Sequence, residues 1–488
     1  MNNMPPVFRV EPPSNPGPPA RVGPVSAGPG GAQSAESDSL YQAQQKVYPR
    51  EVGGRFSRLR VTAAWVLLGL YYLNAWWEWN GRQAFLFDLP ARKFYVLGLV
   101  LWPQDFIFLT GLLIIAALSL FFFTALAGRL WCGYACPQTV WTETFLWMER
   151  FAEGDRRERM KLDQSPWNTR KVLRKSFKQF LWVTFALWTG FTFVGYFTPI
   201  RTLGHEVITG ALGSWEMFWI LFYGLATYTN AGFLREQVCK YMCPYARFQS
   251  AMFDRDTLVI TYDAERGEPR GARRRGANLN GVSSGDCVDC TWCVQVCPTG
   301  IDIRRGLQLE CIACAACIDA CDTVMDKVGS PRGLIRYSTQ HALAHERTHL
   351  FRPRILIYAT LLLLLVSAWV TGLVLRKAVA VDVIRDRNAL YRMLDDGRVE
   401  DVYDVKIMNK TEKTHRFHLS VKGAGDLRLD PDSATFVVRG GEVFPAGVRV
   451  RRPAYDPEGS ETIEFDIKAD DDDSLSSSAS ARFIAPSR

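Results

Sequence analysis

The sequence predicts a multi-domain membrane protein with an α-helical transmembrane domain of about five helices, an inserted cysteine-rich domain and a C-terminal Ig-like β-sandwich. Three observations predict this architecture. Five long apolar runs occur along the chain, two equally spaced groups of Cys lie between the fourth and fifth runs, and short segments of alternating polarity follow the fifth. A length of 488 residues leaves room for two or three domains.

Each apolar run is close to the ~20 residues that a helix needs to cross the hydrocarbon of a bilayer. The runs lie at 61–77, 106–127, 180–200, 217–234 and 355–375. A buried core helix is the alternative for 61–77 and 217–234, but it does not explain five such runs in one chain. The sequence therefore predicts a multi-pass protein.

Lys and Arg set the expected orientation, because they concentrate in cytoplasmic loops. Basic residues crowd before the first run, between the second and third, and after the fourth, whereas the loop between the third and fourth holds only Arg201. This distribution places the N-terminus and the Cys-rich segment in the cytoplasm, and everything after residue 376 in the periplasm. The loops account for the net charge of +8, so anionic lipid is the expected partner and nucleic acid is not.

The first part of the chain, residues 1–50, is rich in Pro, Gly, Ser and Ala. Such a composition buries too little apolar surface to offset the entropy of ordering. It also lacks the apolar stretch of a signal peptide. We expect a disordered cytoplasmic tail.

Eight of the 12 Cys form two runs with the same spacing, C-x2-C-x2-C-x3-C. The first run holds Cys287, Cys290, Cys293 and Cys297, and the second holds Cys311, Cys314, Cys317 and Cys321. Bacterial iron–sulfur proteins use this spacing, and the fourth Cys of each run binds the other cluster, because one tight loop cannot reach around a cubane. The pattern predicts a ferredoxin-like domain with one [4Fe–4S] cluster on Cys287, Cys290, Cys293 and Cys321 and another on Cys311, Cys314, Cys317 and Cys297.

The second run departs from this pattern at its end, where Asp322 stands in place of the Pro that follows Cys297. That Pro shapes a turn and is not a ligand, so we still expect Cys321 to bind. Disulfides and two zinc sites are the alternatives. Disulfides need an oxidising compartment, and zinc sites usually pair two C-x2-C units across a longer gap.

The other four Cys form two C-x3-C-P motifs, each placed directly after the second helix of an expected pair. They are Cys132 and Cys136 before Pro137, and Cys239 and Cys243 before Pro244. Residues i and i+4 share one face of a helix, so each pair could point at one ion. Together the four thiols could form a soft site for copper(I), an iron–sulfur cluster or zinc. Two buried structural Cys pairs are the alternative.

The segment HALAHERTH places His341, His345 and His349 at i, i+4 and i+8. On a helix, this spacing would align three imidazoles along one face, which suits a metal ion. A solvated helix face beside the membrane explains the pattern equally well.

After Lys377 the chain alternates apolar and polar residues in short runs, such as VYDVKIMNK (402–410) and HRFHLSVKG (415–423). Short strands separated by turn residues predict an Ig-like β-sandwich. The segment 470–482, rich in Asp and Ser, is expected to be a loop before the last strand.

The order of these modules resembles the FixG/RdxA/CcoG family of bacterial cytochrome c oxidase accessory proteins, which are membrane polyferredoxins. The resemblance covers about residues 40–488 and includes the segment PRGLIRY (331–337). It implies two [4Fe–4S] clusters and the reduction of Cu(II) to Cu(I) on the cytoplasmic side, for assembly of cbb3-type cytochrome c oxidase. It also implies that copper, as the substrate, meets the thiols of Cys132, Cys136, Cys239 and Cys243.

Two other functions stay open. A quinol-linked electron conduit to a partner complex needs a quinone pocket among the helices and no copper, whereas an assembly scaffold needs only structural clusters. The expected partners are the membrane, an electron donor that the sequence does not identify, and oxidase assembly factors or copper transporters and chaperones. A homodimer is a further option. The expected location is the bacterial inner membrane.

These observations divide the chain into five parts. They are a cytoplasmic tail (1–50), transmembrane helices one to four with both C-x3-C-P motifs (51–250), a cytoplasmic two-cluster domain (251–350), a fifth transmembrane helix (351–377) and a periplasmic Ig-like domain (378–488).

Overall fold

The computed structural model describes residues 46–271, 285–349, 351–387, 390–423, 426–430, 435–453 and 460–485. The tail expected over 1–50 therefore lies, up to residue 45, outside the described residues. The chain forms two compact units, each assembled from separate stretches of sequence. The first comprises Met1–Tyr72, Ala116–Phe193 and Gly213–Leu362, and the second comprises Leu73–Ile115, Val194–Leu212 and Leu363–Arg488.

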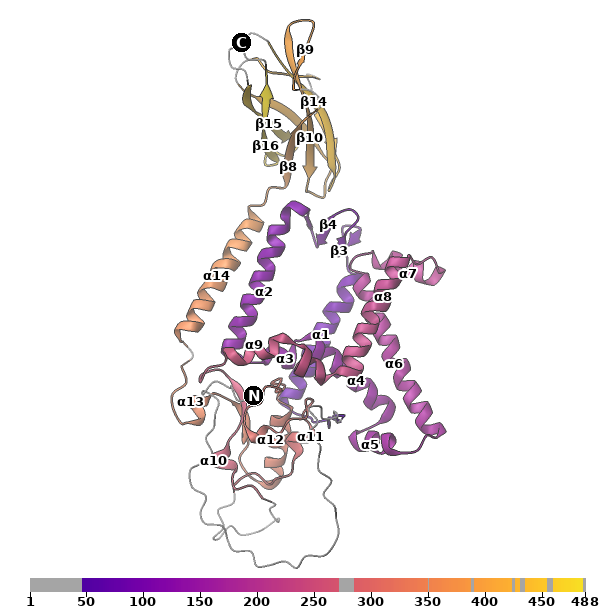
Figure 1. Ribbon diagram of the computed structural model, residues 1–488, viewed down its shortest axis with the longest axis vertical. Helices are drawn as coiled ribbons and strands as arrows, with labels where there is room; N and C mark the ends of the chain where they lie inside the picture. Colours follow the sequence, from indigo (N-terminus) through magenta and orange to yellow (C-terminus); the bar gives the residue numbers. More distant parts are fainter. Residues whose placement is uncertain are drawn as a thin grey trace, which may run out of the picture. The chain divides into compact units, whose positions relative to one another are not determined.

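The first unit begins with the helices that contain or flank both C-x3-C-P motifs (Figure 1). Helices α2 and α6 each continue from one unit into the other. The elements are α1 (Arg55–Leu73), α2 (Phe106–Ala127), α3 (Leu130–Tyr134), α4 (Pro137–Glu153), α5 (Arg156–Gln164), α6 (Thr169–Val194), α8 (Ser214–Thr227), two π-helical segments (Tyr228–Leu234 and Val238–Met242) and α9 (Pro244–Met252).

Within the described residues, two helices are long and apolar enough to cross a bilayer, over Pro103–Ala127 and Pro353–Val374. They correspond to the second and fifth expected spans. Helix α1 contains three Arg, α6 begins with several basic residues, and α8 ends after 14 residues where a π-helical segment starts. The expected count of five spans therefore stays a prediction.

The Cys-rich domain is small and built around a two-stranded antiparallel sheet, β6 (Val259–Tyr262) with β7 (Ile335–Ser338). The sheet joins the two ends of the domain, and buried apolar side chains from α12 pack against it. Its helices are α10 (Ala264–Gly267), α11 (Trp292–Gln295), α12 (Ala316–Val328) and α13 (Gln340–Leu343), after which α14 (Pro353–Val374) begins.

The second unit contains the β-sandwich predicted for the C-terminal part (Figure 1). One sheet has the order β12-β14-β10-β8, with β9 also paired to β10, and the other has the order β13-β11-β15-β16. The strands are β8 (Val379–Arg385), β9 (Arg392–Met393), β10 (Arg398–Asn409), β11 (His415–Lys422), β12 (Arg428–Asp430), β13 (Thr435–Val438), β14 (Val443–Pro453), β15 (Ser460–Ala469) and β16 (Ser476–Ile484).

Alternate residues of β10, β11 and β15 form the sandwich core, as the sequence alternation predicted. Val405, Phe417 and Phe465 are fully buried there. The expected loop over 470–482 is wrong in its second half, because β16 begins at Ser476 and pairs with β15. Small Ser and Ala side chains fit beside β15, and backbone hydrogen bonds along its whole length hold β16 in place.

The second unit also holds small elements that the sequence did not predict. They are β1 (Glu78–Trp79), β2 (Arg82–Gln83), β3 (Phe85–Asp88), β4 (Lys93–Val96), β5 (Leu99–Leu101) and α7 (Ile200–Thr209). Just before α2, buried Asp105 accepts hydrogen bonds from Arg376 (2.6 Å) and Lys410 (3.2 Å). This ion cluster joins the start of α2 to the chain that enters the sandwich.

Candidate functional site

The linings of two cavities in the Cys-rich domain each include a set of four Cys, three from one run and one from the other. Cys287, Cys290, Cys293 and Cys321 line the first, and Cys297, Cys311, Cys314 and Cys317 line the second. Cys293 lies between the cavities and borders both. They contain about 360 and 340 Å³ of space that no protein atom fills, part of which is open to solvent. The structure thus brings together the same two sets of thiols that the spacing pairs across the runs.

The backbone of both Cys runs follows one repeated conformation. The residues directly before and directly after the second Cys have positive φ, at Asp289 (52°) and Thr291 (54°) in the first run and Ala313 (54°) and Ala315 (59°) in the second. Non-Gly residues keep this costly conformation only where their surroundings enforce it. Such turns direct successive backbone N–H groups to one side, which suits an anionic iron–sulfur centre.

Most thiols of these runs are buried or half-buried, whereas Cys290 is exposed. Burial raises the pKa of Cys293, Cys311 and Cys321 to about 12, and it also raises the pKa of Cys317. At neutral pH these side chains keep their protons until a metal centre displaces them. Buried soft ligands, an apolar lining and inward backbone N–H groups together fit two [4Fe–4S] clusters, which supply storage and transfer of single electrons when bound.

The two C-x3-C-P motifs share one local geometry. Cys132 lies in α3 and Cys239 in the π-helical segment Val238–Met242, whereas Cys136 and Cys243 are extended, with ψ of 128° and 110°. The Pro that follows each motif begins the next helix and excludes the helical conformation from the residue before it. The expectation that each pair shares one continuous helix face is therefore wrong.

Cys132 and Cys239 nonetheless pack against one buried cluster, and the other two thiols lie near enough to act on them electrostatically. Burial raises the pKa of Cys239 to about 12, with a further upward contribution from the charges of Cys136, Cys132 and Cys243. Burial likewise raises the pKa of Cys132 to about 11, and Cys136 adds to that shift. The side-chain amide of buried Gln249 lies 3.6 Å from Sγ of Cys132. We call Cys132, Cys136, Cys239 and Cys243 the thiol quartet.

Side chains at the start of α4 tie the two motifs to each other. Gln138 Nε2 donates hydrogen bonds to the carbonyl oxygens of Asn230 (2.9 Å) and Arg235 (3.1 Å), which precede the second motif. Thr139 Oγ1 donates to the carbonyl oxygen of Cys132 over 2.6 Å. The first turn of α4 therefore fixes the backbone on both sides of the thiol quartet.

The thiol quartet lies directly against the second Cys run. Cys132 and Cys239 pack on a buried apolar cluster that contains Cys314 and also contacts Cys317. A Cβ atom on Gly133 would lie 2.8 Å from the carbonyl oxygen of Ala313 and 2.9 Å from Cα of Cys314. Only Gly permits this approach of α3 to the run.

Buried polar groups hold together the contact between these helices and the second Cys run, which we call the junction. The guanidinium of Arg129 donates to carbonyl oxygens of Leu309 and Cys311, with a distance of 3.2 Å for the second, and also to Ala246. Arg60 of α1 donates to the carbonyl oxygen of Cys314 over 2.9 Å. Helices therefore contact the backbone of the second run from two directions.

Asp319 of α12 caps helix α1 from across the junction. Its carboxylate accepts the backbone N–H groups of Phe56 (3.2 Å) and Ser57 (2.7 Å), which lie in the first turn of α1. A Cβ atom on Gly54 would overlap this carboxylate. The carboxylate satisfies donors that a helix leaves free at its N-terminus. Because these residues are more than 250 positions apart, no sequence pattern indicated the contact.

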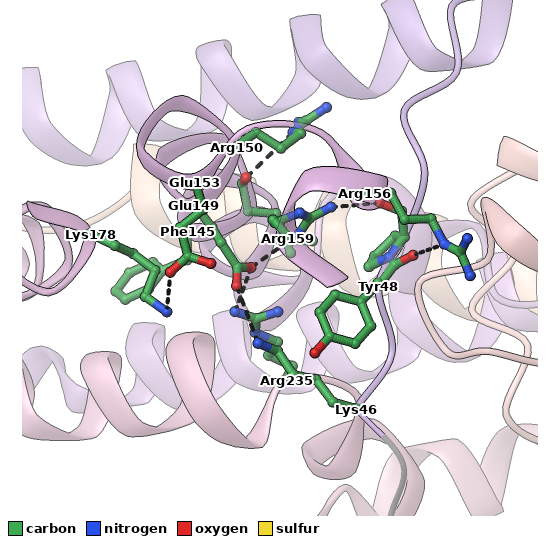
Figure 2. Close-up of polar contacts among 12 residues, drawn as sticks. Lys46, Tyr48, Phe145, Glu149, Arg150, Glu153, Arg156, Arg159, Lys178 and Arg235 are labelled. Carbon is green, nitrogen blue, oxygen red and sulfur yellow. Dashed lines mark hydrogen bonds and ion pairs between the residues drawn. The ribbon is translucent and has the colours of Figure 1, made fainter. Parts of the chain in front are cut away.

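A buried ionic network, drawn in Figure 2, holds the chain segment that leads to Cys239. Glu149 of α4 is fully buried and binds Arg159 (3.2 Å) and Arg235 (2.9 Å). One helical turn on, Glu153 contacts Nζ of Lys178 at 2.9 Å. Arg235 has a positive φ of 40° and lies four residues before Cys239. The network holds this strained turn, so it positions the second motif.

The three His do not align along a helix, so that expectation is wrong. Helix α13 ends at Leu343, and the backbone at His345 is left-handed with φ of 55°. His345 Nε2 lies 3.1 Å from a carboxylate oxygen of Glu265. His341 and His349, by contrast, come together beside Asp256, a residue that the sequence did not single out.

Family comparisons agree with the cluster geometry. A 4Fe-4S dicluster domain matches residues 234–340, a 4Fe-4S binding domain matches 109–153, and the IG-like fold at the C-terminus of FixG matches 369–486. Iron–sulfur clusters are therefore resident cofactors of this chain. The match over 109–153 includes Cys132 and Cys136, and that over 234–340 includes Cys239 and Cys243, so both motifs fall in iron–sulfur families.

Three relatives are similar over most of their length. The protein RdxB of Cereibacter sphaeroides is 43% identical over 81% of this chain and 85% of its own, and RdxA of the same organism is 41% identical over 80% and 85%. The nitrogen fixation protein FixG of Rhizobium meliloti is 38% identical over 85% of this chain and 88% of its own. With its cluster domains, the chain is an iron–sulfur protein of electron transfer, and it belongs to the FixG/RdxA family.

Proposed function

We propose that this chain is a multi-pass protein of the bacterial inner membrane that passes electrons from its clusters to Cu(II) and yields Cu(I) for the assembly of cbb3-type cytochrome c oxidase. The cluster domain and N-terminus would face the cytoplasm, and the β-sandwich would face the periplasm. The orientation follows from the distribution of basic loops, and the link to the oxidase follows from the family resemblance.

One observation carries the proposal. Cys132 and Cys239 pack against the same buried side chains as Cys314, so the thiol quartet and the second cluster site share a wall. Gly133 allows the closest backbone approach at this wall. An electron leaving the second cluster would therefore reach the thiol quartet over a short path along packed side chains.

The thiol quartet has the chemistry to favour the product of the reaction. Each Cu(II) would take up one electron and become Cu(I), with no change in covalent bonds other than exchange of its ligands. Thiolate sulfur is a soft ligand that prefers Cu(I). Because burial raises the pKa of Cys132 and Cys239, binding of the ion would release protons from these thiols.

A second candidate, the quinol-linked conduit, is favoured by a different feature. A larger cavity, with about 1040 Å³ of unfilled space that is partly open to solvent, borders both Cys239 and Cys314. Arg60, Gln138 and Trp147 are among its polar lining residues. A quinol, which is planar and carries two oxygen atoms, could bind in this cavity and reduce the second cluster directly.

Copper reduction by the full chain separates these functions. The protein is reduced with dithionite without oxygen, freed of excess reductant, and mixed with Cu(II) and a Cu(I)-specific chelator. We expect about two Cu(I) per chain, one for each cluster. Replacing Cys132 and Cys136 with Ser should abolish this reaction while the clusters stay loaded and reducible.

Tyr241→Phe is the matched control, because Tyr241 lies between the two Cys of the second motif and is 72% exposed. It should reduce Cu(II) at the wild-type rate. A Cys132→Ser, Cys136→Ser variant as fast as the wild type would contradict copper reduction at the thiol quartet. Rapid cluster reduction by a short-chain quinol, together with no Cu(I) from the wild type, would favour the conduit.

The role in the cell needs a separate test. A strain that lacks this chain should contain less active cbb3-type oxidase, and the wild-type chain should restore it. The Cys132→Ser, Cys136→Ser variant should not. Full restoration by that variant would instead favour the assembly scaffold, in which the thiol quartet has no redox role.

A further inference from the structure

A second group of metal-ligating side chains lies outside the thiol quartet and the cluster sites, shortly before α14. Asp256, His341 and His349 each offer one ligand atom, and these atoms lie within 4.8 Å of one another. We propose that these three side chains form a site for a divalent transition-metal ion that binds Cu(II) most tightly.

The three side chains are already arranged around a common point. His341 Nδ1 lies 2.8 Å from Oδ1 of Asp256, and the backbone N–H of His349 donates to the same oxygen over 3.0 Å. The two imidazole rings are almost perpendicular, at 86°, with centroids 6.1 Å apart. Little rearrangement is needed for both rings and the carboxylate to face one ion.

Local backbone contacts fix this arrangement. Thr339 caps α13 with its hydroxyl, which accepts a backbone hydrogen bond of 3.1 Å in the first turn. The backbone N–H of His341 donates to the carbonyl oxygen of Arg255 over 3.3 Å, so α13 is joined to the residue beside Asp256. Asp256 in turn donates its backbone N–H to Oδ1 of Asp254 over 3.0 Å.

The donor set selects the class of ion. Two imidazoles and one carboxylate suit divalent copper, zinc, nickel or iron, whereas Cu(I) prefers sulfur. Among divalent ions, sites of this kind bind Cu(II) most tightly. Three protein ligands leave a position for water or for ligand exchange, and His349 is on the exposed side.

Neighbouring charges leave the site favourable for a cation. Glu346 Oε2 lies 3.6 Å from Nε2 of His341, where a carboxylate can receive the outer N–H of a metal-bound imidazole. Arg352 lies 3.9 Å from Oδ2 of Asp256, but it contacts Asp254 more closely. The positive charge of Arg352 is therefore balanced mainly by Asp254, and it reduces the negative potential at Asp256 only in part.

The position of the site suggests a role that rests on the proposed function. Helix α9 runs from Pro244, next to Cys243 of the thiol quartet, to Met252, and nine residues of helix span about 14 Å. Nitrogen and oxygen ligands would hold the oxidised ion near one end of α9, and sulfur ligands would hold the reduced ion at the other. The site would thus collect Cu(II) before its reduction.

Cu(II) binding to the full, cluster-loaded chain tests the site. The protein is kept oxidised and free of oxygen, in the Cys132→Ser, Cys136→Ser background so that the quartet does not reduce the ion. One equivalent of Cu(II) is added, EPR reports nitrogen splitting, and competition with a Cu(II) chelator gives the affinity. We expect nitrogen-bound Cu(II), and an affinity more than about 100-fold weaker after His341→Gln with His349→Gln, since loss of outer partners alone costs ~10–100-fold.

His345→Gln is the matched control, because His345 comes from the same segment, is 80% exposed and pairs with Glu265 instead. It should bind Cu(II) like its parent. His349→Gln alone, which leaves the backbone contact to Asp256 intact, should already weaken binding at unchanged iron content. Equal affinity in the double His variant and its parent would overturn the site, as would an equal loss in His345→Gln.

The outcomes distinguish this site from the proposed function. If Cu(II) binds through nitrogen in a His-dependent way but the chain with its quartet intact never forms Cu(I), the site stands and copper reduction fails. If Cu(I) forms at low Cu(II) concentrations with no dependence on His341 or His349, copper reduction stands and the role of the site in collecting Cu(II) fails.

Discussion

Removing the Asp319 carboxylate should release the start of α1 from the second Cys run. In Asp319→Ala, the N–H groups of Phe56 and Ser57 lose a buried charged acceptor at 3.2 and 2.7 Å. A hydrogen bond to a charged group is worth about 1.5–3 kcal/mol, and a helix cap about 0.5–2 kcal/mol. Taking one strong and one weaker bond, we expect a loss of about 3 kcal/mol, or roughly 150-fold in local opening.

Native-state hydrogen exchange of the amides at the start of α1 measures this opening directly. Asp319→Asn keeps an acceptor without its charge and should show a smaller increase in exchange. Asp326→Ala is the control, because Asp326 lies on the same helix, α12, but pairs with Arg332 at the surface. Unchanged exchange in Asp319→Ala, with both clusters loaded, would refute the cap as the link between α1 and α12.

Three further predictions follow from the same junction. Gly133→Ala should lower the free energy of unfolding by about 1–3 kcal/mol and slow the oxidation of the clusters by Cu(II) in stopped-flow, because the added Cβ meets backbone atoms of Ala313 and Cys314. Gly69→Ala is the control and should have neither effect, since no atom lies within 4 Å of its Cβ. Glu149→Ala should cost about 3–5 kcal/mol in urea unfolding, since Arg159 and Arg235 lose their buried partner. The fraction of clusters that survive an iron chelator should rise with pH. Burial raises the pKa of the cluster thiols, so protons compete with iron for the sulfur atoms at pH values below that pKa. A fraction that does not change with pH would contradict this.

Features set by local spacing could be predicted from the sequence. The intervals within the Cys runs determine how far one loop can reach, so the cross-run sets of thiols around each cavity followed from spacing. The alternation of β10 and β11 likewise predicted the sandwich core. In both cases the pattern that predicts the structure is a spacing of two to four residues, repeated along the segment.

Features set by tertiary contact could not be predicted. Asp319 and Ser57 are 262 residues apart, and Glu149 and Arg235 are 86 apart, so no periodicity connects them. The prediction of one helix through the three His was wrong, because the helix that Thr339 caps ends at Leu343, before His345 and His349. The C-x3-C-P motifs misled in the same way, because each Pro ends the helical conformation one residue earlier. Gly133, between Cys132 and Cys136, was the one local sign that α3 approaches the second Cys run closely.

The number of iron atoms per chain, combined with EPR of the reduced protein, decides whether the chain holds two clusters beside a separate thiol quartet. We expect about eight iron and eight sulfide, four for each cluster, and two interacting reduced clusters. Cys321→Ser should remove the first cluster and leave the second, and the Cys132→Ser, Cys136→Ser variant should keep all the iron. About twelve iron in the wild type, falling to about eight in that variant, would show a third cluster on the thiol quartet and contradict its role as a copper site.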